Sequence, residues 1–227
     1  MTFMGFLFAN TIHLRLASAF MKRNILIIIL LFCLNSMYAQ NPIIIGDCTV
    51  TYSISGNDAT TKNLTGTVKT LYVKGKMSRT DLVSQNYKQS IIYNNTNGIA
   101  VVLKEVGEEK YMSTLSADKW KKENKRFEGL KLTPANETKT ILGYQCKKLI
   151  ATLKDGTSYS MYYTKDIVPS ATENPYQFKD VPGFVLEYET FYANSSSRIT
   201  YTATVINFNP VPASKFEIPS AGYRILE

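Results

Sequence analysis

Apolar and polar residues alternate along several short segments of the chain, which is the pattern of half-buried β-strands. The clearest case is residues 47–57, where every second residue from Cys48 to Ile54 is apolar. Similar β-rich runs cover residues 66–74, 76–84, 87–94, 99–103, 110–112, 144–153, 157–164, 184–191 and 198–208. Asn97-Gly98 and Asp155-Gly156 each separate two of these runs and are typical of hairpin turns.

One segment has the pattern of a helix. Ser116 is a suitable N-cap for a helix over residues 117–126, and Gly129 marks its end. Trp120 stands at the spacing of a hydrophobic staple. Residues 168–183 contain three prolines and predict a long irregular loop. These elements predict one domain over residues 40–227, of mainly β (α+β) class, with an antiparallel sheet and one main helix.

The first 39 residues predict a targeting segment rather than part of this fold. Residues 21–39 begin with two basic residues, continue with an uncharged apolar run and end in small or weakly polar residues. This order is typical of a secretory signal peptide, with cleavage after Ala39 and a mature chain that starts near Gln40. The natural start is either Met1 or Met21, and the sequence leaves both open. No later apolar run predicts a transmembrane segment.

Removal of the leader changes what the composition implies. The full chain carries a formal net charge of +8, but residues 1–39 hold three basic residues and no acidic one, so the remainder carries +5. His13, the single histidine, lies in the leader. Cys48 and Cys146 are the cysteines that remain, and they predict either a disulfide, as in many exported proteins, or two buried free thiols.

The residue types present disfavour most catalytic chemistry. Without histidine, the mature chain cannot form a Ser-His-Asp or Cys-His arrangement or a histidine-containing metal site. No nucleotide-binding or phosphate-binding fingerprint occurs. Glu187 and Glu189 are about 7 Å apart on one strand face, which suits an inverting glycosidase, but that face is expected to be solvated sheet surface. We therefore expect a protein that is not an enzyme and has no catalytic residue, metal or cofactor.

Three stretches in the second half, in this order, resemble a known group of exported bacterial proteins. They are ILGYQCKK at 141–148, MYYTKDI at 161–167 and VPGFVLEY at 181–188. Together they are similar to the LolA-like class of domains and the related GLPGLI family, over roughly residues 45–226. The resemblance implies a curved antiparallel half-barrel whose concave side is covered by a helix and loops. It also implies export to the periplasm or cell envelope of a Gram-negative bacterium.

The same resemblance implies a hydrophobic ligand, an acyl chain, lipid or lipid-modified partner, in the concavity. The candidate cavity residues are Ile54, Ile91, Val101, Trp120, Ile150, Met161, Phe184, Leu186, Ile199 and Val205. The basic helix is a candidate contact for an anionic lipid surface through Lys119, Lys121, Lys122, Lys125 and Arg126, and an ordinary solvated helix face is the other interpretation. The alternative function is an envelope protein-interaction module that docks a partner on a sheet edge or on loop 168–183. Nucleic acid is not an expected partner.

Overall fold

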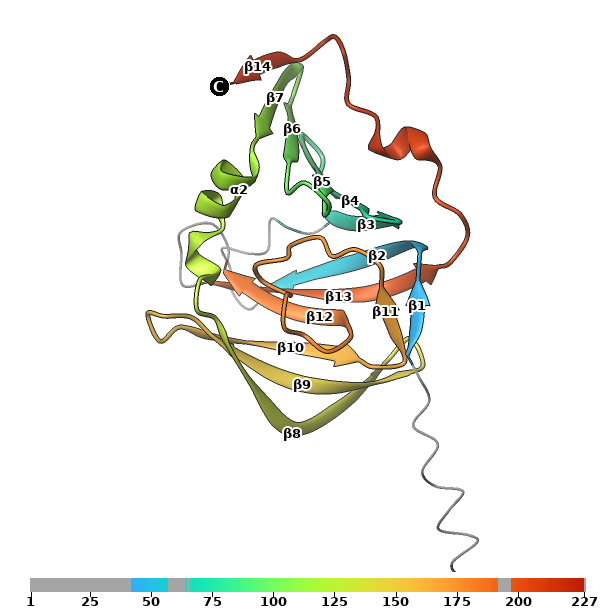
Figure 1. Ribbon diagram of the computed structural model, residues 1–227, viewed down its shortest axis with the longest axis vertical. Coiled ribbons are helices and arrows are strands. Elements are labelled where there is room, and N and C mark those ends of the chain that lie inside the picture. The colour runs from blue at the N-terminus through green and yellow to red at the C-terminus, as the bar shows by residue number, and fades with distance from the viewer. Residues whose placement is uncertain (1–41, 57–63, 65, 192–196, 227) are drawn as a thin grey trace, which may run out of the picture. The chain divides into compact units, whose positions relative to one another are not determined.

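A single large β-sheet dominates the computed structural model, which describes residues 42–56, 64, 66–191 and 197–226 (Figure 1). The described residues belong to one unit, Pro42–Glu227. The predicted leader and signal peptide lie outside the described residues. The sheet has twelve strands in the order β14-β7-β6-β5-β4-β3-β2-β13-β12-β10-β9-β8. The mainly β prediction is therefore confirmed.

The sheet is antiparallel throughout except at one edge, where the short β14 pairs in parallel with β7. A separate parallel pair joins β1 to β11. The strands are β1 Ile43–Ile45, β2 Asp47–Gly56, β3 Val68–Lys74, β4 Met77–Val83, β5 Tyr87–Asn94, β6 Ala100–Val106, β7 Glu109–Leu115, β8 Lys131–Ile141, β9 Tyr144–Thr152, β10 Ser158–Thr164, β11 Ile167–Pro169, β12 Phe184–Phe191, β13 Arg198–Asn207 and β14 Arg224–Leu226.

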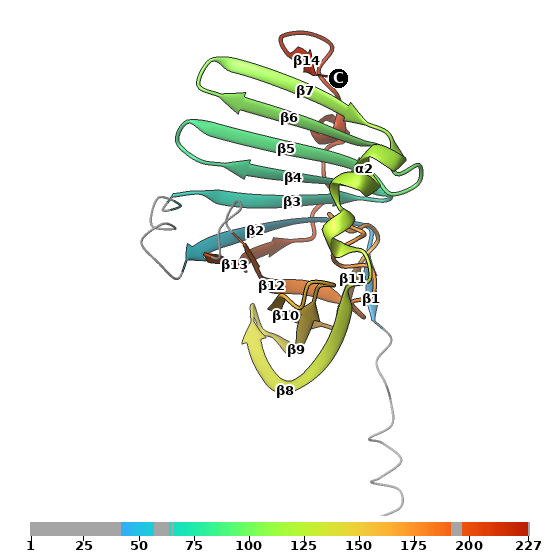
Figure 2. The same ribbon diagram turned by 90° about the vertical axis from the view of Figure 1, so that its left-hand side faces the viewer.

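The sheet is strongly curved, and β8 bends sharply along its length (Figure 2). The register between β8 and β9 shifts between Pro134 and Thr138, which is the bulge that accompanies this bend. Two further register shifts lie at Tyr162/Tyr163 in β10 and at Ala203/Val205 in β13. Bulges increase local twist, so these three positions curve the half of the sheet that contains β8 to β13.

Register gives the sheet two distinct faces from β2 to β7. On the first face, one row of directly paired residues runs through Leu71, Thr80, Ile91, Val102 and Ser113. We call this the helix-side face, because the helix after β7 packs on it. Residues of the alternate phase form the tail-side face, because the C-terminal segment packs there. This division decides which predicted residues share a surface.

Helix α2, Ala117–Glu123, is shorter than the predicted 117–126 because a 3-10 turn, η3 Lys125–Phe127, follows it. The predicted N-cap is confirmed, since the Ser116 side chain accepts a hydrogen bond from the Lys119 backbone N–H. Trp120 is buried against Tyr93 and Ala100. The helix therefore packs on the helix-side face through this one large side chain. In the described part of the chain, no helix is long and apolar enough to cross a membrane.

The C-terminal segment crosses the tail-side face before β14. Phe216, at the end of the short 3-10 helix η4 (Ala213–Phe216), packs with Tyr223 against the buried Ile92 and Leu103. The Arg79 guanidinium donates to the Lys215 carbonyl oxygen at 2.7 Å. Both faces of β4 to β7 are therefore at least partly covered.

Cys48 and Cys146 are both free thiols in the structure. Both belong to one buried apolar cluster with Val50, Leu71 and Leu186. Burial raises the pKa of the Cys48 thiol to about 12 and that of Cys146 to about 11. Of the two sequence-based interpretations, the structure shows the buried thiols and not the disulfide.

Residues 170–183, which we call the strap, connect β11 to β12 and are packed against the sheet. The Ser170 hydroxyl donates to the Gly75 carbonyl oxygen at 2.7 Å. At the far end, a Cβ added to Gly183 would lie 1.9 Å from the Thr164 carbonyl oxygen. Since backbone atoms cannot yield as flexible side chains can, only glycine fits there. The Val181-Pro182-Gly183 motif is therefore structural.

We predict that Gly183→Ala destabilises the protein by more than about 3 kcal/mol, beyond the usual range for overpacked cores. Gly46→Ala is the matched control, because no atom lies within 4 Å of an added Cβ and its φ is not positive. The control should change the free energy of unfolding by less than about 1 kcal/mol. Urea unfolding measures both, and equal stability of the two variants would contradict the close approach.

Candidate functional site

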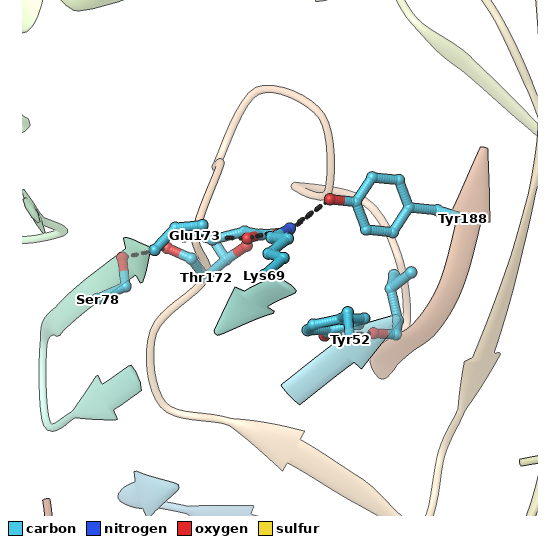
Figure 3. Close-up of polar contacts among 8 residues, drawn as sticks. Tyr52, Lys69, Ser78, Thr172, Glu173 and Tyr188 are labelled. Carbon is cyan, nitrogen blue, oxygen red and sulfur yellow. Dashed lines mark hydrogen bonds and ion pairs between the residues drawn. The ribbon is translucent and has the colours of Figure 1, made fainter. Parts of the chain in front are cut away.

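A buried lysine stands at the centre of the helix-side face. Lys69 on β3 occupies the same alternation phase as Leu71 and Val73, and it is only 4% exposed. Its ammonium forms an ion pair with Glu173 of the strap at 2.6 Å and donates a hydrogen bond to the Tyr188 hydroxyl. Figure 3 shows Lys69 pointing toward both partners. β3, the strap and β12 therefore meet at the ammonium group of Lys69.

Three tyrosine rings surround this ammonium. The Lys69 Nζ atom lies 5.0 Å from the ring centroid of Tyr52, 4.8 Å from that of Tyr188 and 4.9 Å from that of Tyr201. Such cation–π contacts strengthen when water is excluded. Burial lowers the pKa of Lys69, and the Glu173 carboxylate offsets part of this effect. Burial and the same carboxylate raise the pKa of Tyr188 well above its ordinary value.

Neighbouring hydrogen bonds hold the strap beside this ion pair. Glu173 also accepts from the Thr80 hydroxyl at 3.1 Å. The Thr172 carbonyl oxygen accepts from the Ser78 hydroxyl at 2.9 Å, as Figure 3 shows, and from the Asn95 amide at 3.3 Å. The strap is thus bound to β3, β4 and the turn after β5 over two consecutive residues.

Two asparagines join the strap to helix α2. The Asn124 amide donates to the Trp120 carbonyl oxygen at 2.9 Å. The Asn174 amide donates to the Asn124 side-chain oxygen at 2.8 Å. The Asn174 side-chain oxygen accepts the backbone N–H groups of Tyr176 and Gln177. Helix and strap therefore form one cover over the helix-side face.

Two adjoining hollows lie between this cover and the sheet. The inner cavity, of about 180 Å³, is lined by Lys69, Thr80, Leu82, Gln89, Ile91, Trp120, Glu173, Asn174, Gln177, Tyr188 and Tyr201. The outer groove, of about 480 Å³, is lined by Gln89, Ile91, Val102, Lys104, Tyr111, Ser113, Leu115, Trp120, Glu123, Asn124 and Leu226. The two adjoin because they share Gln89, Ile91 and Trp120. The outer groove is within the size range of small-molecule sites, roughly 300–1,000 Å³.

Three buried side-chain polar groups in the described part of the chain lack a hydrogen-bond partner. Among the described residues, the buried Trp120 Nε1 and Gln177 Nε2 have no hydrogen-bond partner. The Tyr159 hydroxyl is a third such group, and it lies close enough to the Gln177 side chain to interact with it. Most buried polar groups in proteins are hydrogen-bonded, so a cluster of exceptions requires an explanation. Trp120 and Gln177 line the inner cavity, but each of these two nitrogen atoms exposes less than 1 Å² and so does not face the cavity.

A third hollow, of about 320 Å³, lies beside the strap and is lined mainly by residues 168–185. Tyr52 and Leu71 form part of its floor. Most of its lining is the strap itself, so it is best described as space under a packed loop. We take the inner cavity and outer groove together as the candidate site.

The structure brings together few of the ten predicted cavity residues. Only Ile91 and Trp120 line the inner cavity and outer groove. Ile54, Met161 and Ile199 share the helix-side face by register but lie away from these hollows. Phe184 and Leu186 are buried in the apolar cluster that contains Tyr52. These five side chains contribute to the sheet surface and core rather than to the site.

The structure corrects the expectation for three more of the ten. Val101 lies on the tail-side face, where it packs with Ile92 and Leu103. Ile150 and Val205 are in the opposite alternation phase to the helix-side residues of their strands. Val205 is 53% exposed, because the bulge at Ala203/Val205 turns it outward. A cavity on the helix-side face therefore excludes all three.

Glu187 and Glu189 are engaged in structural contacts. Glu187 is only 7% exposed, which corrects the expectation of a solvated surface. It accepts hydrogen bonds from Lys139 of the bent β8 at 2.6 Å and from the Thr202 hydroxyl at 2.7 Å. Glu189 accepts from the Ser160 backbone N–H at 2.8 Å. Neither lines the inner cavity or the outer groove.

The five basic residues of the helix region are exposed. Lys121, Lys122 and Lys125 border a shallow hollow of about 330 Å³ beside Tyr176, together with Asp118 and Glu128. Arg126 instead contacts the Thr190 hydroxyl at 3.4 Å. The acidic neighbours reduce the positive charge of this surface, so its contact with an anionic lipid stays a prediction.

The residues at the centre of the site were missed by the sequence analysis. Lys69 did carry a signal, because a lysine in the apolar phase of an alternating strand is unusual. Glu173 and Gln177 lie in an irregular loop and carried none. In the described part of the chain, no group of three histidine, cysteine or carboxylate side chains is arranged to hold a metal ion.

Comparison with known proteins gives a distant similarity in fold. Two solved structures of PNGF-II, in the C2 and P21 space groups, are 15% and 14% identical to this chain, with TM-scores of 0.46 and 0.48. The similarity covers 79% and 80% of this chain but 30% and 31% of the PNGF-II chains. No protein-family model and no curated protein matches the chain. The resemblance to the LolA-like class and the GLPGLI family therefore stays a prediction.

We predict that Lys69 and Glu173 are strongly coupled in a double-mutant cycle. Lys69→Met or Glu173→Gln alone leaves a buried charge unpaired and should cost about 3–5 kcal/mol. The double variant should lose far less than the sum of the two single losses, because no buried charge is unpaired. Urea unfolding provides the measurement.

Lys154→Met is the control, because the Lys154–Glu128 pair is exposed, with side-chain exposures of 66% and 58%. The free energy of unfolding of Lys154→Met should be close to that of the unmodified protein. If the loss of unfolding free energy in the double variant equals the sum of the two single losses within about 0.5 kcal/mol, Lys69 and Glu173 are not coupled, which would contradict the prediction.

Proposed function

We propose that this protein is a non-enzymatic binding protein of the cell envelope that holds a small acyl-chain ligand in the outer groove. The observation that carries the proposal is the groove itself, between β5–β7 and helix α2. Ile91, Val102, Leu115, Trp120 and Leu226 give it apolar walls, and its volume is about 480 Å³. Burial of a ligand's apolar surface against these side chains provides the driving force for binding.

The arrangement of the cover supports a binding role. The strap is attached to the sheet by side-chain hydrogen bonds and one ion pair, and helix α2 by the packing of Trp120, rather than by strand pairing. The Asn174–Asn124 hydrogen bond joins the strap to the end of the helix. Preformed small-molecule sites combine apolar walls with a few placed polar groups, and the outer groove and inner cavity do the same. The envelope location rests on the signal peptide predicted for residues 21–39.

The absence of an enzymatic role is part of the proposal. Thr80, Ser113 and the tyrosines provide hydroxyl groups in these hollows, but none of the described residues is a histidine that could act as their base. The carboxylate of Glu173 is paired with Lys69, and the nearby Glu187 and Glu189 lie outside the hollows. The supported role is therefore retention of a ligand.

An interaction module that pairs through a sheet edge has weaker support. β8 forms one edge of the sheet and is mostly exposed. It carries Pro134, Lys131 and Lys139 and a bulge, all of which discourage pairing with another strand. The strap, the other predicted docking segment, is packed on the sheet. We therefore favour ligand binding.

We predict that Ser113→Phe blocks binding of a ten-carbon acyl chain, because Ser113 lines the outer groove and a larger side chain would fill it. Thr114→Phe is the matched control, since the next residue points to the other face and is exposed. Fluorescence of Trp120, the single tryptophan, reports titrations with decanoate and decanamide.

The unmodified protein and Thr114→Phe should bind at least one of the two ligands saturably. Ser113→Phe should bind it about tenfold more weakly or worse. Absence of saturable binding of both ligands by the unmodified protein would rule out the proposed function, as would equal binding by all three proteins.

A further inference from the structure

One end of the outer groove is polar and basic. Gln89, Lys104 and Tyr111 are directly paired across β5, β6 and β7 on the helix-side face, and all three line the groove. β14 continues the same row, because Arg224 is the partner of Tyr111. We call these four residues the basic row, since two of them are cations.

Strand alternation directs Arg224 to the same face as the groove. Leu226, two residues later in β14, lines the groove. Tyr223, the residue before Arg224, instead packs against Ile92 and Leu103 on the tail-side face. Because successive residues of a strand point to opposite faces, Arg224 shares the helix-side face with Leu226. Both cations of the basic row therefore lie on the face that forms the groove.

The groove becomes apolar away from the basic row. The next row of paired residues consists of Ile91, Val102, Ser113 and Leu226. Beyond it, Leu115 and Trp120 line the groove where helix α2 crosses the ends of these strands (Figure 2). Since a strand rises about 3.4 Å per residue, the path from Tyr111 to Leu115 is about 14 Å long. The groove therefore suits an elongated ligand with a polar head and an apolar chain.

The two cations of the basic row have no carboxylate partner. In the described part of the chain, no ion pair includes Lys104 or Arg224. On the tail-side face, by contrast, Lys88 and Lys110 both pair with Glu105, at 3.3 and 3.8 Å. The cations on the groove side are thus available to a ligand, whereas those on the other face are already paired.

The carboxylates near the groove favour one orientation of an anionic ligand. Glu109, two residues before Tyr111, accepts a hydrogen bond from the Tyr111 hydroxyl at 3.5 Å. Glu123 lines the groove from helix α2. An anionic head at the helix would be repelled by Glu123, whereas at the basic row it would meet two cations and one anion. The head is therefore favoured at the basic row, with the chain directed toward the helix.

We propose that the ligand is a medium-chain carboxylic acid whose carboxylate lies between Lys104 and Arg224. Its chain extends along Val102 toward Trp120. Both basic side chains are exposed, so the carboxylate stays in contact with water and its charge is not buried. This inference rests on the proposed function, because it concerns the same groove. It assigns the ligand class as acyl chains with a free carboxylate rather than amides or esters.

The test is calorimetric titration of the protein with decanoate and decanamide at pH 8 and low ionic strength. The two ligands have the same chain, and only decanoate is charged. We expect decanoate to bind about fivefold more tightly or better. Lys104→Met and Arg224→Met should each weaken decanoate by about two- to fivefold and leave decanamide unchanged. Lys88→Met is the control, because it removes a cation from the other face, and it should change neither.

The unmodified protein provides a second measurement, which does not depend on the folding of a variant. High salt should reduce the preference for decanoate, because salt screens exposed charges. A preference that high salt leaves unchanged would overturn the inference.

The other contrary outcomes are distinct. Equal binding of the two ligands, or tighter binding of decanamide, would overturn the inference while the groove remains a binding site. A preference for decanoate that persists in both Lys104→Met and Arg224→Met would also overturn it, because the head would then lie elsewhere. Failure of both ligands to bind would instead remove the proposed function.

Discussion

The Lys69–Glu173 ion pair is the interaction on which the candidate site depends. A strand lysine buried among Tyr52, Tyr188 and Tyr201 is unfavourable alone, and the carboxylate that compensates it comes from a loop more than a hundred residues later in the chain. A buried Lys69 ammonium or Glu173 carboxylate without its partner would destabilise the fold. The strap therefore has one favourable position on the sheet, the one that pairs the two charges. That position closes one side of the inner cavity.

The asparagine contacts extend this constraint to the helix. Once Glu173 is fixed, Asn174 lies where it can donate to Asn124, which in turn caps the end of α2. Trp120 is then held between the helix and the sheet, in contact with Tyr93 and beside both hollows. The buried charge of Lys69 thus determines, through the strap and helix α2, the position of Trp120, which would contact the ligand.

The sequence predicted the strands well where their two faces differ in polarity. β5 and β12 have the predicted bounds, and β2 differs by one residue. β2 buries alternate residues as predicted, whereas β12 is buried on both faces over its first five residues. β8 was missed, since an edge strand with a proline and mostly exposed positions has no such alternation. The site was predicted poorly. Trp120 and Ile91 were found from local pattern, whereas Glu173 and Gln177 reach the site only through the tertiary path of an irregular loop.

The central claim is that the Lys69–Glu173 ion pair holds the strap on the sheet, and hydrogen exchange of the strap backbone tests it directly. We expect Lys69→Met to raise the exchange rates of the backbone amides of residues 170–183 about tenfold or more. Lys154→Met, which removes an exposed ion pair, should leave these rates unchanged. Strap amides that exchange at the same rate in Lys69→Met as in the unmodified protein would contradict the account.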